Sequence, residues 1–132
     1  MRLGRNADIP ALLALQAEVV PSLEHRVPRA DLQIAVRCST VIVAEHDGAV
    51  VGWGAATPVG RDWRILGIVV HHEQRRQGVG TGILEALAAL ASPTTRSIAA
   101  HAPSPEATRM LAKAGFFCLE GRFYREPERR RA

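Results

Sequence analysis

The amino-acid sequence predicts a single mixed α/β domain, and three observations lead to this prediction. The chain has 132 residues, a length that suits one hydrophobic core. Hydrophobic residues make up 47% of the chain and charged residues 23%, which excludes a collagen, a coiled coil and a wholly disordered protein. Helix-like and strand-like hydrophobic patterns also alternate along the sequence.

Two helices are predicted near the amino terminus. Asp8 is a favourable N-cap residue, and Pro10 suits the first helical turn. Leucines and valines then recur at helical spacing, so a helix is expected over 8–20, ending near Pro21. A second, short helix is expected over 29–38, where apolar residues lie among charged ones.

The hydrophobic pattern then becomes typical of β-strands. The segment 41–45 is rich in β-branched residues, and the turn signal Asp47-Gly48 separates it from a second strand over 49–55. These two strands are expected to form an antiparallel hairpin. The apolar run 63–70 indicates a third strand that is buried on both faces.

A glycine-rich turn and a helix follow this third strand. The segment 78–82 contains three glycines, and the apolar stripe over 83–90 predicts a helix that Pro93 ends. A strand that leads into a glycine-rich turn at a helix start is a common device for binding phosphate. The first N–H groups of the helix lack partners, and glycine lets the ligand approach the backbone.

The last third of the chain is predicted to hold a strand, a helix and a hairpin. Ser104 as N-cap and Pro105 at the first helical position begin the helix, and Gly115 ends it as a left-handed cap. The expected ranges are 96–102 for the strand, 116–120 and 121–126 for the hairpin, and 127–132 for a polar tail.

The net charge of +4 comes from a basic set in which Lys113 is the one lysine among 17 basic residues. An arginine-rich composition can indicate anion recognition, since guanidinium binds phosphate through a planar fork. Codon bias in a GC-rich genome is the preferred explanation for the overall content, and the many alanines agree with it. Apart from Arg75-Arg76 and the tail, the arginines are scattered, and no aromatic platform accompanies them. No nucleic-acid partner is therefore expected.

The cysteines and the apolar runs bear on metal binding and location. Cys38 and Cys118 lie far apart in no metal-like spacing, so we expect two free, buried thiols and no bound metal. The first residues lack the apolar region of a signal peptide, and no apolar run reaches the roughly 18 residues of a membrane span. The expectation is a cytoplasmic protein with no membrane partner.

Two segments resemble the GNAT superfamily of N-acetyltransferases. The segment 75–80, Arg-Arg-Gln-Gly-Val-Gly, matches the acyl-CoA signature Arg/Gln-x-x-Gly-x-Gly/Ala. The segment 104–116 resembles the family pattern Asn-x-x-Ala-x-x-x-Tyr-x-x-x-Gly-Phe, and the element order matches from about 1 to 126. The resemblance implies one acyl-CoA N-acyltransferase domain over 1–132. It implies an α/β (α+β) fold with a mixed, mostly antiparallel sheet, splayed at its centre and flanked by helices.

The resemblance further implies that acetyl-CoA binds in a V-shaped gap between the strands 63–70 and 96–102. Backbone N–H groups of the glycine turn would hold the pyrophosphate, and the free edge of the strand 63–70 would pair with the pantetheine amides. The cofactor-binding residues are then predicted to be Ile68, Val69, Val70, Arg75, Arg76, Gln77, Gly78, Val79, Gly80, Thr81 and Ser104.

The implied reaction is direct transfer of an acetyl group from acetyl-CoA to a primary amine of a small molecule or a protein. This reaction needs an acceptor for the amine proton and a proton donor for the CoA thiolate. The family's tyrosine position holds Leu111 here, and its asparagine position holds Ser104. The candidate catalytic residues are His101, Ser104 and Tyr124. Each also has a structural interpretation: a surface histidine at a strand end, a helix N-cap and a packing aromatic.

The acceptor and the oligomeric state are less defined by the sequence. Only Glu24, Glu45 and Trp53 hint at a pocket for the amine. Because the family tyrosine is missing, a catalytically weak or inactive CoA-binding or regulatory module of the same fold stays open as a second function. The final strands offer a sheet edge through which a homodimer can form.

Overall fold

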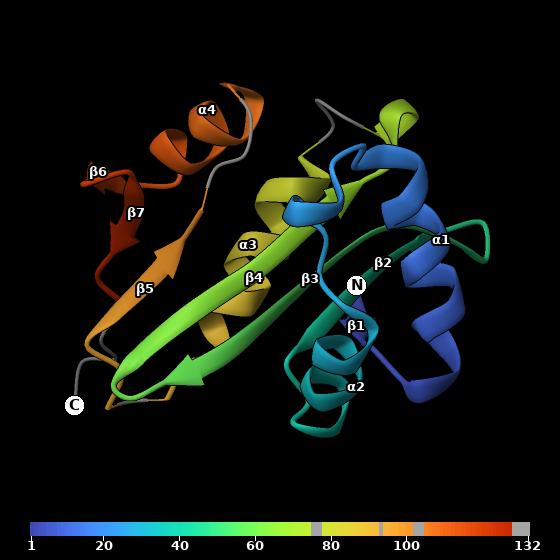
Figure 1. Ribbon diagram of the computed structural model, residues 1–132, viewed down its shortest axis with the longest axis horizontal. Coiled ribbons are helices and arrows are strands. Elements are labelled where there is room, and N and C mark those ends of the chain that lie inside the picture. The colour runs from blue at the N-terminus through green and yellow to red at the C-terminus, as the bar shows by residue number, and fades with distance from the viewer. Residues whose placement is uncertain (75–77, 93, 102–104, 128–132) are drawn as a thin grey trace.

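The computed structural model describes residues 1–74, 78–92, 94–101 and 105–127. Helices cover both faces of a central sheet (Figure 1). The strands are β1 (Arg2–Leu3), β2 (Val41–His46), β3 (Ala49–Val59), β4 (Asp62–Val70), β5 (Ser97–Ala100), β6 (Phe117–Leu119) and β7 (Arg122–Arg125). The α-helices are α1 (Ile9–Val19), α2 (Arg29–Arg37), α3 (Val79–Ala89) and α4 (Pro105–Lys113), and the short 3-10 turns are η1 (Asn6–Asp8), η2 (Leu23–His25) and η3 (His72–Gln74).

The sheet joins strands that are far apart in sequence. In the described part of the chain, it has seven strands in the order β1-β2-β3-β4-β5-β7-β6. The β4–β5 pair is parallel, and the other neighbouring pairs are antiparallel. The predicted mixed, mostly antiparallel sheet is therefore confirmed. The sequence did not predict β1, which is only two residues long.

The strands β4 and β5 begin together and then diverge toward their carboxyl ends (Figure 1). Their pairing runs from Asp62↔Ser97 to Arg64↔Ala99 and ends there. Ser97 Oγ donates a hydrogen bond of 2.8 Å to Asp62 Oδ1 at the first pair. The predicted splaying of the sheet at its centre is thus present, and it follows a short parallel contact.

A β-bulge lies in β4 just beyond the point where it leaves β5. The pairs Ala55↔Gly67 and Ala56↔Ile65 leave Leu66 as an extra residue on β4. A bulge bends its strand and shifts the inward and outward alternation by one position. The carboxyl half of β4 is therefore offset from the half that pairs with β5.

Two buried clusters attach the helices to opposite faces of the sheet. The indole of Trp53 lies on the face of α1 and donates a hydrogen bond of 3.0 Å to the Leu12 carbonyl. The indole of Trp63 lies on the other face and donates one of 2.8 Å to the Leu87 carbonyl of α3. Leaving a buried N–H without a partner costs about 1–3 kcal/mol, so these bonds help to fix each helix on the sheet.

The carboxyl-terminal strands are tied to the helices by Arg125. Its guanidinium donates to Glu85 Oε1 of α3 at 2.7 Å and to the Ala114 carbonyl at 3.0 Å. It also lies 5.4 Å above the ring centre of Phe116. Arg125 thereby joins β7, α3 and the end of α4.

The expectation of buried thiols is wrong. Cys38 and Cys118 are free, but both are exposed. Cys38 follows the last turn of α2, and Cys118 lies on β6, an edge strand whose three residues are all exposed. Among the described residues, no helix has the length and hydrophobicity that a membrane span requires.

Candidate functional site

The candidate site lies where β4 and β5 separate. Over 65–70, β4 pairs with β3 and, within the described residues, no longer with β5. The backbone groups of this segment that point toward β5 can therefore pair with an extended ligand. Ile68, Val69 and Val70, the strand residues predicted to contact a cofactor, all belong to it.

The start of α3 supplies the second part of the site. Gly78 precedes the helix with φ of 78°, in the left-handed region that glycine tolerates. Gly82 N–H donates the first helical bond, of 2.9 Å, to the Gly78 carbonyl. Because Gly78 has no side chain to cap the helix, the N–H groups of Val79, Gly80 and Thr81 are available to an anion.

Four predicted site residues lie outside the described residues: Arg75, Arg76, Gln77 and Ser104. Their roles stay predictions.

Gly80 marks the close approach of three elements. A Cβ at this position would lie 3.0 Å from Met110 Sδ of α4 and 3.5 Å from Val70 Cγ2 of β4. The start of α3 therefore lies against the end of β4 and against α4. The sequence motif predicts that the small size of Gly80 lets a ligand approach its backbone. The structure adds that Gly80 also packs closely against Met110.

The predicted catalytic residue His101 follows β5 directly and is exposed. Its ring centre lies 6.0 Å from that of His25, with 42° between the ring planes. His25 ends η2, in the connection between α1 and α2. Sequence reasoning missed His25, because local patterns do not show that a connection between two helices reaches the end of a distant strand.

The connection that carries His25 is anchored by a buried amide. Gln16 of α1 is only 3% exposed. Its Nε2 donates to the Val27 carbonyl at 3.0 Å, and its Oε1 accepts from Val27 N–H at 2.8 Å. Val27 Cγ2 in turn would lie 3.0 Å from a Cβ at Gly67, so the connection crosses β4 at its bulge (Figure 1).

The predicted catalytic residue Tyr124 lies on β7, away from this contact, and Ser104 falls outside the described residues. Tyr124 pairs with Ala99, at the end where β5 still contacts β4, and its ring lies 6.1 Å from that of Phe117. It lines a hollow of about 270 Å³ with residues of β6 and β7. Tyr124 and His101 are not in contact in the described part of the chain, so the catalytic role of Tyr124 stays a prediction. Leu111, at the family's tyrosine position, is 2% exposed and belongs to the core.

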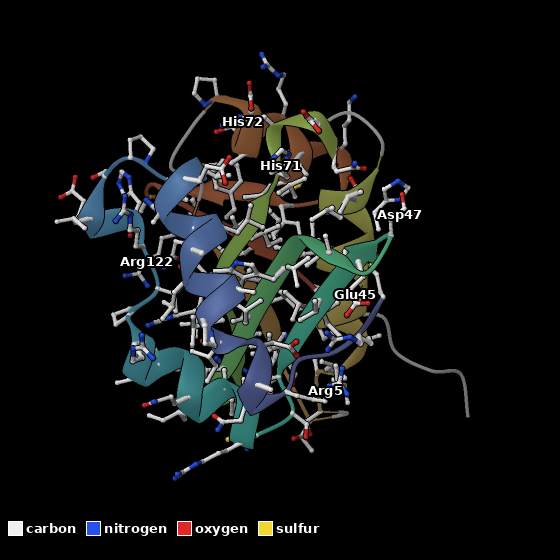
Figure 2. The ribbon with its side chains drawn as sticks, turned by 90° about the vertical axis from the view of Figure 1, so that its right-hand side faces the viewer. Arg5, Glu45, Asp47, His71, His72 and Arg122 are labelled. Atoms are coloured by element: carbon white, nitrogen blue, oxygen red, sulfur yellow. The ribbon has the colours of Figure 1, made fainter. Side chains whose placement is uncertain are left out.

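The histidines that follow β4 lie at one end of the molecule (Figure 2). His71 Nδ1 accepts the Glu73 N–H at 3.2 Å, and His71 Nε2 lies 3.6 Å from Glu18 Oε1 of α1. These contacts connect the end of β4 to the end of α1. They give His71 a structural role at the base of the glycine turn.

Of the three residues that the sequence suggested for an amine pocket, Trp53 and Glu45 have structural roles instead. Trp53 is fully buried in the core. Glu45 forms an ion pair with Arg2, which also binds both carboxylate oxygens of Asp8, at 2.7 and 2.8 Å. Hydrogen bonds from Arg2 lower the pKa of Asp8 to about 2, and the hydrogen bond with Asp8 raises the pKa of Arg2 further above its usual value. This cluster joins β1, η1 and β2. Of the three residues that the sequence suggested for the amine pocket, Glu24 therefore remains as a candidate.

Comparison with known proteins gives consistent results. Residues 10–116 match the model of the acetyltransferase (GNAT) family. The chain is 33% identical over 116 residues to a mycothiol acetyltransferase of Parafrankia sp. strain EAN1pec, covering 83% of this chain and 36% of that protein.

Two solved structures share the fold. Ard1 from Thermoplasma volcanium superposes with a TM-score of 0.79 at 22% identity, covering 96% of each chain. Rv2747 from Mycobacterium tuberculosis, solved in complex with CoA, has a TM-score of 0.74 at 25% identity, covering 90% of this chain and 72% of that one. The match of the family model over most of the sequence shows that the chain belongs to the acetyltransferase (GNAT) family.

Proposed function

We propose that the chain transfers an acetyl group from acetyl-CoA directly to a primary amine. The observation that carries the proposal is the separation of β4 from β5 beside the start of α3. This arrangement offers a strand edge to the pantetheine amides and helix N–H groups to the pyrophosphate. Family membership and the CoA complex of the Mycobacterium tuberculosis protein support a CoA-type cosubstrate.

The binding residues follow from this placement. Ile68, Val69 and Val70 would pair with the pantetheine through their backbone, and Gly78, Val79, Gly80 and Thr81 would hold the pyrophosphate through their N–H groups. Arg75 and Arg76 would pair with the outer phosphate oxygens, and Gln77 and Ser104 complete the predicted set.

In the proposed reaction, His101 takes one proton from the incoming ammonium group. The freed amine attacks the thioester carbonyl carbon, so that the N–C bond forms and the C–S bond breaks. A second proton moves from the attacking nitrogen to the sulfur, and the products are the acetylated amine and the CoA thiol. The buried Leu111 offers no hydroxyl for this second transfer, which is why the proton is assigned to the amine itself.

The acceptor is an amine of a small molecule or of a protein. The similarity to a mycothiol acetyltransferase supports a small molecule as the first choice. The chain corresponds to 36% of that relative, so the substrate of the relative does not transfer directly.

The proposal is tested by following thiol release from acetyl-CoA with spermidine, n-butylamine, glucosamine and an alanine-terminated peptide as acceptors. We expect acetyl-CoA to raise the melting temperature, because a ligand that binds the folded state stabilises it, and at least one acceptor to accelerate thiol release. Absence of any melting shift at saturating acetyl-CoA would overturn the proposal.

The second candidate is a CoA-binding or regulatory module without turnover. The observation that favours it is the burial of Leu111 at the position of the family's tyrosine. A melting shift with acetyl-CoA, combined with no thiol release above the acceptor-free rate for the whole panel, would select this candidate.

A further inference from the structure

The contact between His25 and His101 brings two imidazoles to the diverging end of β4 and β5. The ring centres are 6.0 Å apart, and the rings come from opposite sides of the gap: one from the connection after α1, the other from the end of β5. His25 keeps 34% of its side chain exposed and His101 is exposed, so both rings can meet a substrate and solvent.

The position of His25 is fixed by contacts on both sides of it. Before it, His25 N–H donates to the Ser22 carbonyl at 3.1 Å. After it, the Arg26 guanidinium donates to the Val20 carbonyl at 2.7 Å and to the Ala17 carbonyl at 3.3 Å, which closes the end of α1. Val27 is then held by Gln16. These bonds give the backbone around His25 a defined conformation, so the ring is presented to His101 by the fold.

The surroundings of the pair suit proton transfer. Glu24 Oε1 lies 3.9 Å from His25 Nε2, and the Glu24 side chain is 80% exposed. Among the described residues, the titratable groups in contact with His25 are Glu24 of the same turn and His101, which follows β5, while Arg26 points its guanidinium toward α1. The pair thus faces a carboxylate that is open to water.

We propose that His25 and His101 act as one proton-accepting pair for the acceptor amine. This inference rests on the proposed function and adds a residue to it. One proton of the ammonium group moves to the His101 imidazole, and the N–H bond that breaks leaves a neutral amine. The neutral His25 ring then takes this proton from His101, so that the His101 N–H bond breaks as the His25 N–H bond forms. The nearby Glu24 carboxylate stabilises the charge on His25, which releases the proton to solvent, and the pair returns to its starting state. An imidazole exchanges protons near neutral pH, which suits this role.

The pair also determines which acceptors are favoured. A protonated primary amine is attracted by the Glu24 carboxylate, and the two imidazoles take its proton where the amine meets the gap. An acidic acceptor is repelled by Glu24. The structure therefore assigns cationic primary amines as the acceptor class.

The test compares His25→Gln, His101→Gln, the double variant and the control His46→Gln. His46 lies on the β2–β3 hairpin with 65% of its side chain exposed. Initial rates of thiol release are measured with acetyl-CoA and spermidine between pH 6 and 9. We expect His25→Gln to lower kcat at pH 7 by about 10-fold or more, in the range of general-base effects, with the KM for acetyl-CoA unchanged. The double variant should lose less than the product of the two single losses.

The pH profile separates a proton-handling role from a structural one. Toward pH 9 the free amine becomes more abundant, so the deficit of His25→Gln should shrink, and added imidazole should restore part of the rate at pH 7. A deficit that is equal at every pH, or a rate equal to that of His46→Gln, would overturn the inference. The acetyl-CoA melting shift of His25→Gln serves as the folding control. If the wild type transfers acetyl to no acceptor of the panel, the proposed function fails, and the role of the pair fails with it.

Discussion

At the scale of single residues, the structure separates polar side chains that support the fold from those that face the site. Arg2, Asp8 and Glu45 form a cluster on the first strands and lie away from the diverging strands. Their charges are used for stability. Of the acidic residues that the sequence offered for the acceptor, Glu24 alone lies beside an imidazole of the candidate site.

The Asp8 carboxylate makes the free energy of unfolding depend on pH at the acidic end of the range. Its pKa falls from 3.8 to about 2 on folding, so the unfolded chain binds the proton more tightly. The stabilisation is complete above about pH 4 and is lost as the pH falls toward 2. We expect Asp8→Asn to lower the free energy of unfolding by about 1 kcal/mol at pH 7, with the difference from the wild type vanishing near pH 2. Urea unfolding at both pH values measures it.

The control for Asp8 is Asp47→Asn at the hairpin tip. Asp47 is 90% exposed and adopts φ of 51°, a conformation that asparagine also accepts. Its substitution should leave stability within about 0.5 kcal/mol of the wild type at both pH values. A pH-independent effect of Asp8→Asn would contradict the assignment to this ion pair.

At the scale of elements, the connection from α1 to α2 holds the candidate acceptor residues, and Gln16 holds the connection. Gln16→Leu keeps the helix and the side-chain volume but leaves the buried Val27 N–H and carbonyl without partners. We expect a loss of about 2–4 kcal/mol in the free energy of unfolding and a rise in the KM for the amine, with a smaller effect on acetyl-CoA. Thermal unfolding and thiol-release kinetics measure the two effects.

Gln33→Leu is the matched control, because Gln33 is exposed on α2. It should change stability by no more than about 0.5 kcal/mol. Equal melting temperatures for the two variants would show that the Gln16 amide does not fix the connection.

The elements themselves were largely predictable, because their signals are local. The helical spacing of apolar residues over 8–20 predicts α1, and the glycine cap at Gly115 predicts the end of α4. The Asp47-Gly48 turn predicts the β2–β3 hairpin. The contact between His25 and His101 was not predictable in this way. It depends on the path of a connection that one buried glutamine fixes, and a glutamine within an apolar helix face carries no signal of its partner.

At the scale of the whole molecule, the resemblance predicted the splayed sheet, and the structure adds how the two halves are held. The contacts between the halves include a short strand pairing, the Asp62–Ser97 hydrogen bond, the Arg125–Glu85 ion pair and a shared buried cluster. The half with β1–β4 supplies the strand edge and the acceptor connection. The half with β5–β7 supplies His101. Neither half contains the complete site.

Hydrogen exchange measured with and without acetyl-CoA tests this arrangement for the whole chain. Amides over 65–70 and 78–81 should exchange more slowly in the presence of acetyl-CoA, because the ligand supplies their missing partners. Amides of β2 and α2 should be unchanged, since these elements lie away from the gap. Uniform protection of every element would instead indicate general stabilisation without a site between β4 and β5.

The short seam between β4 and β5 has a mechanical consequence. Only three residue pairs connect β4 to β5 by strand pairing, so the buried cluster that includes Trp63, Ile83, Ile98 and Leu111 provides much of the contact across it. A cosubstrate lying along β4 and reaching α3 and α4 would bridge that seam. The molecule would then be most rigid with the cosubstrate bound. Release of the product would leave β4 and β5 freer to separate before the next cosubstrate enters between them.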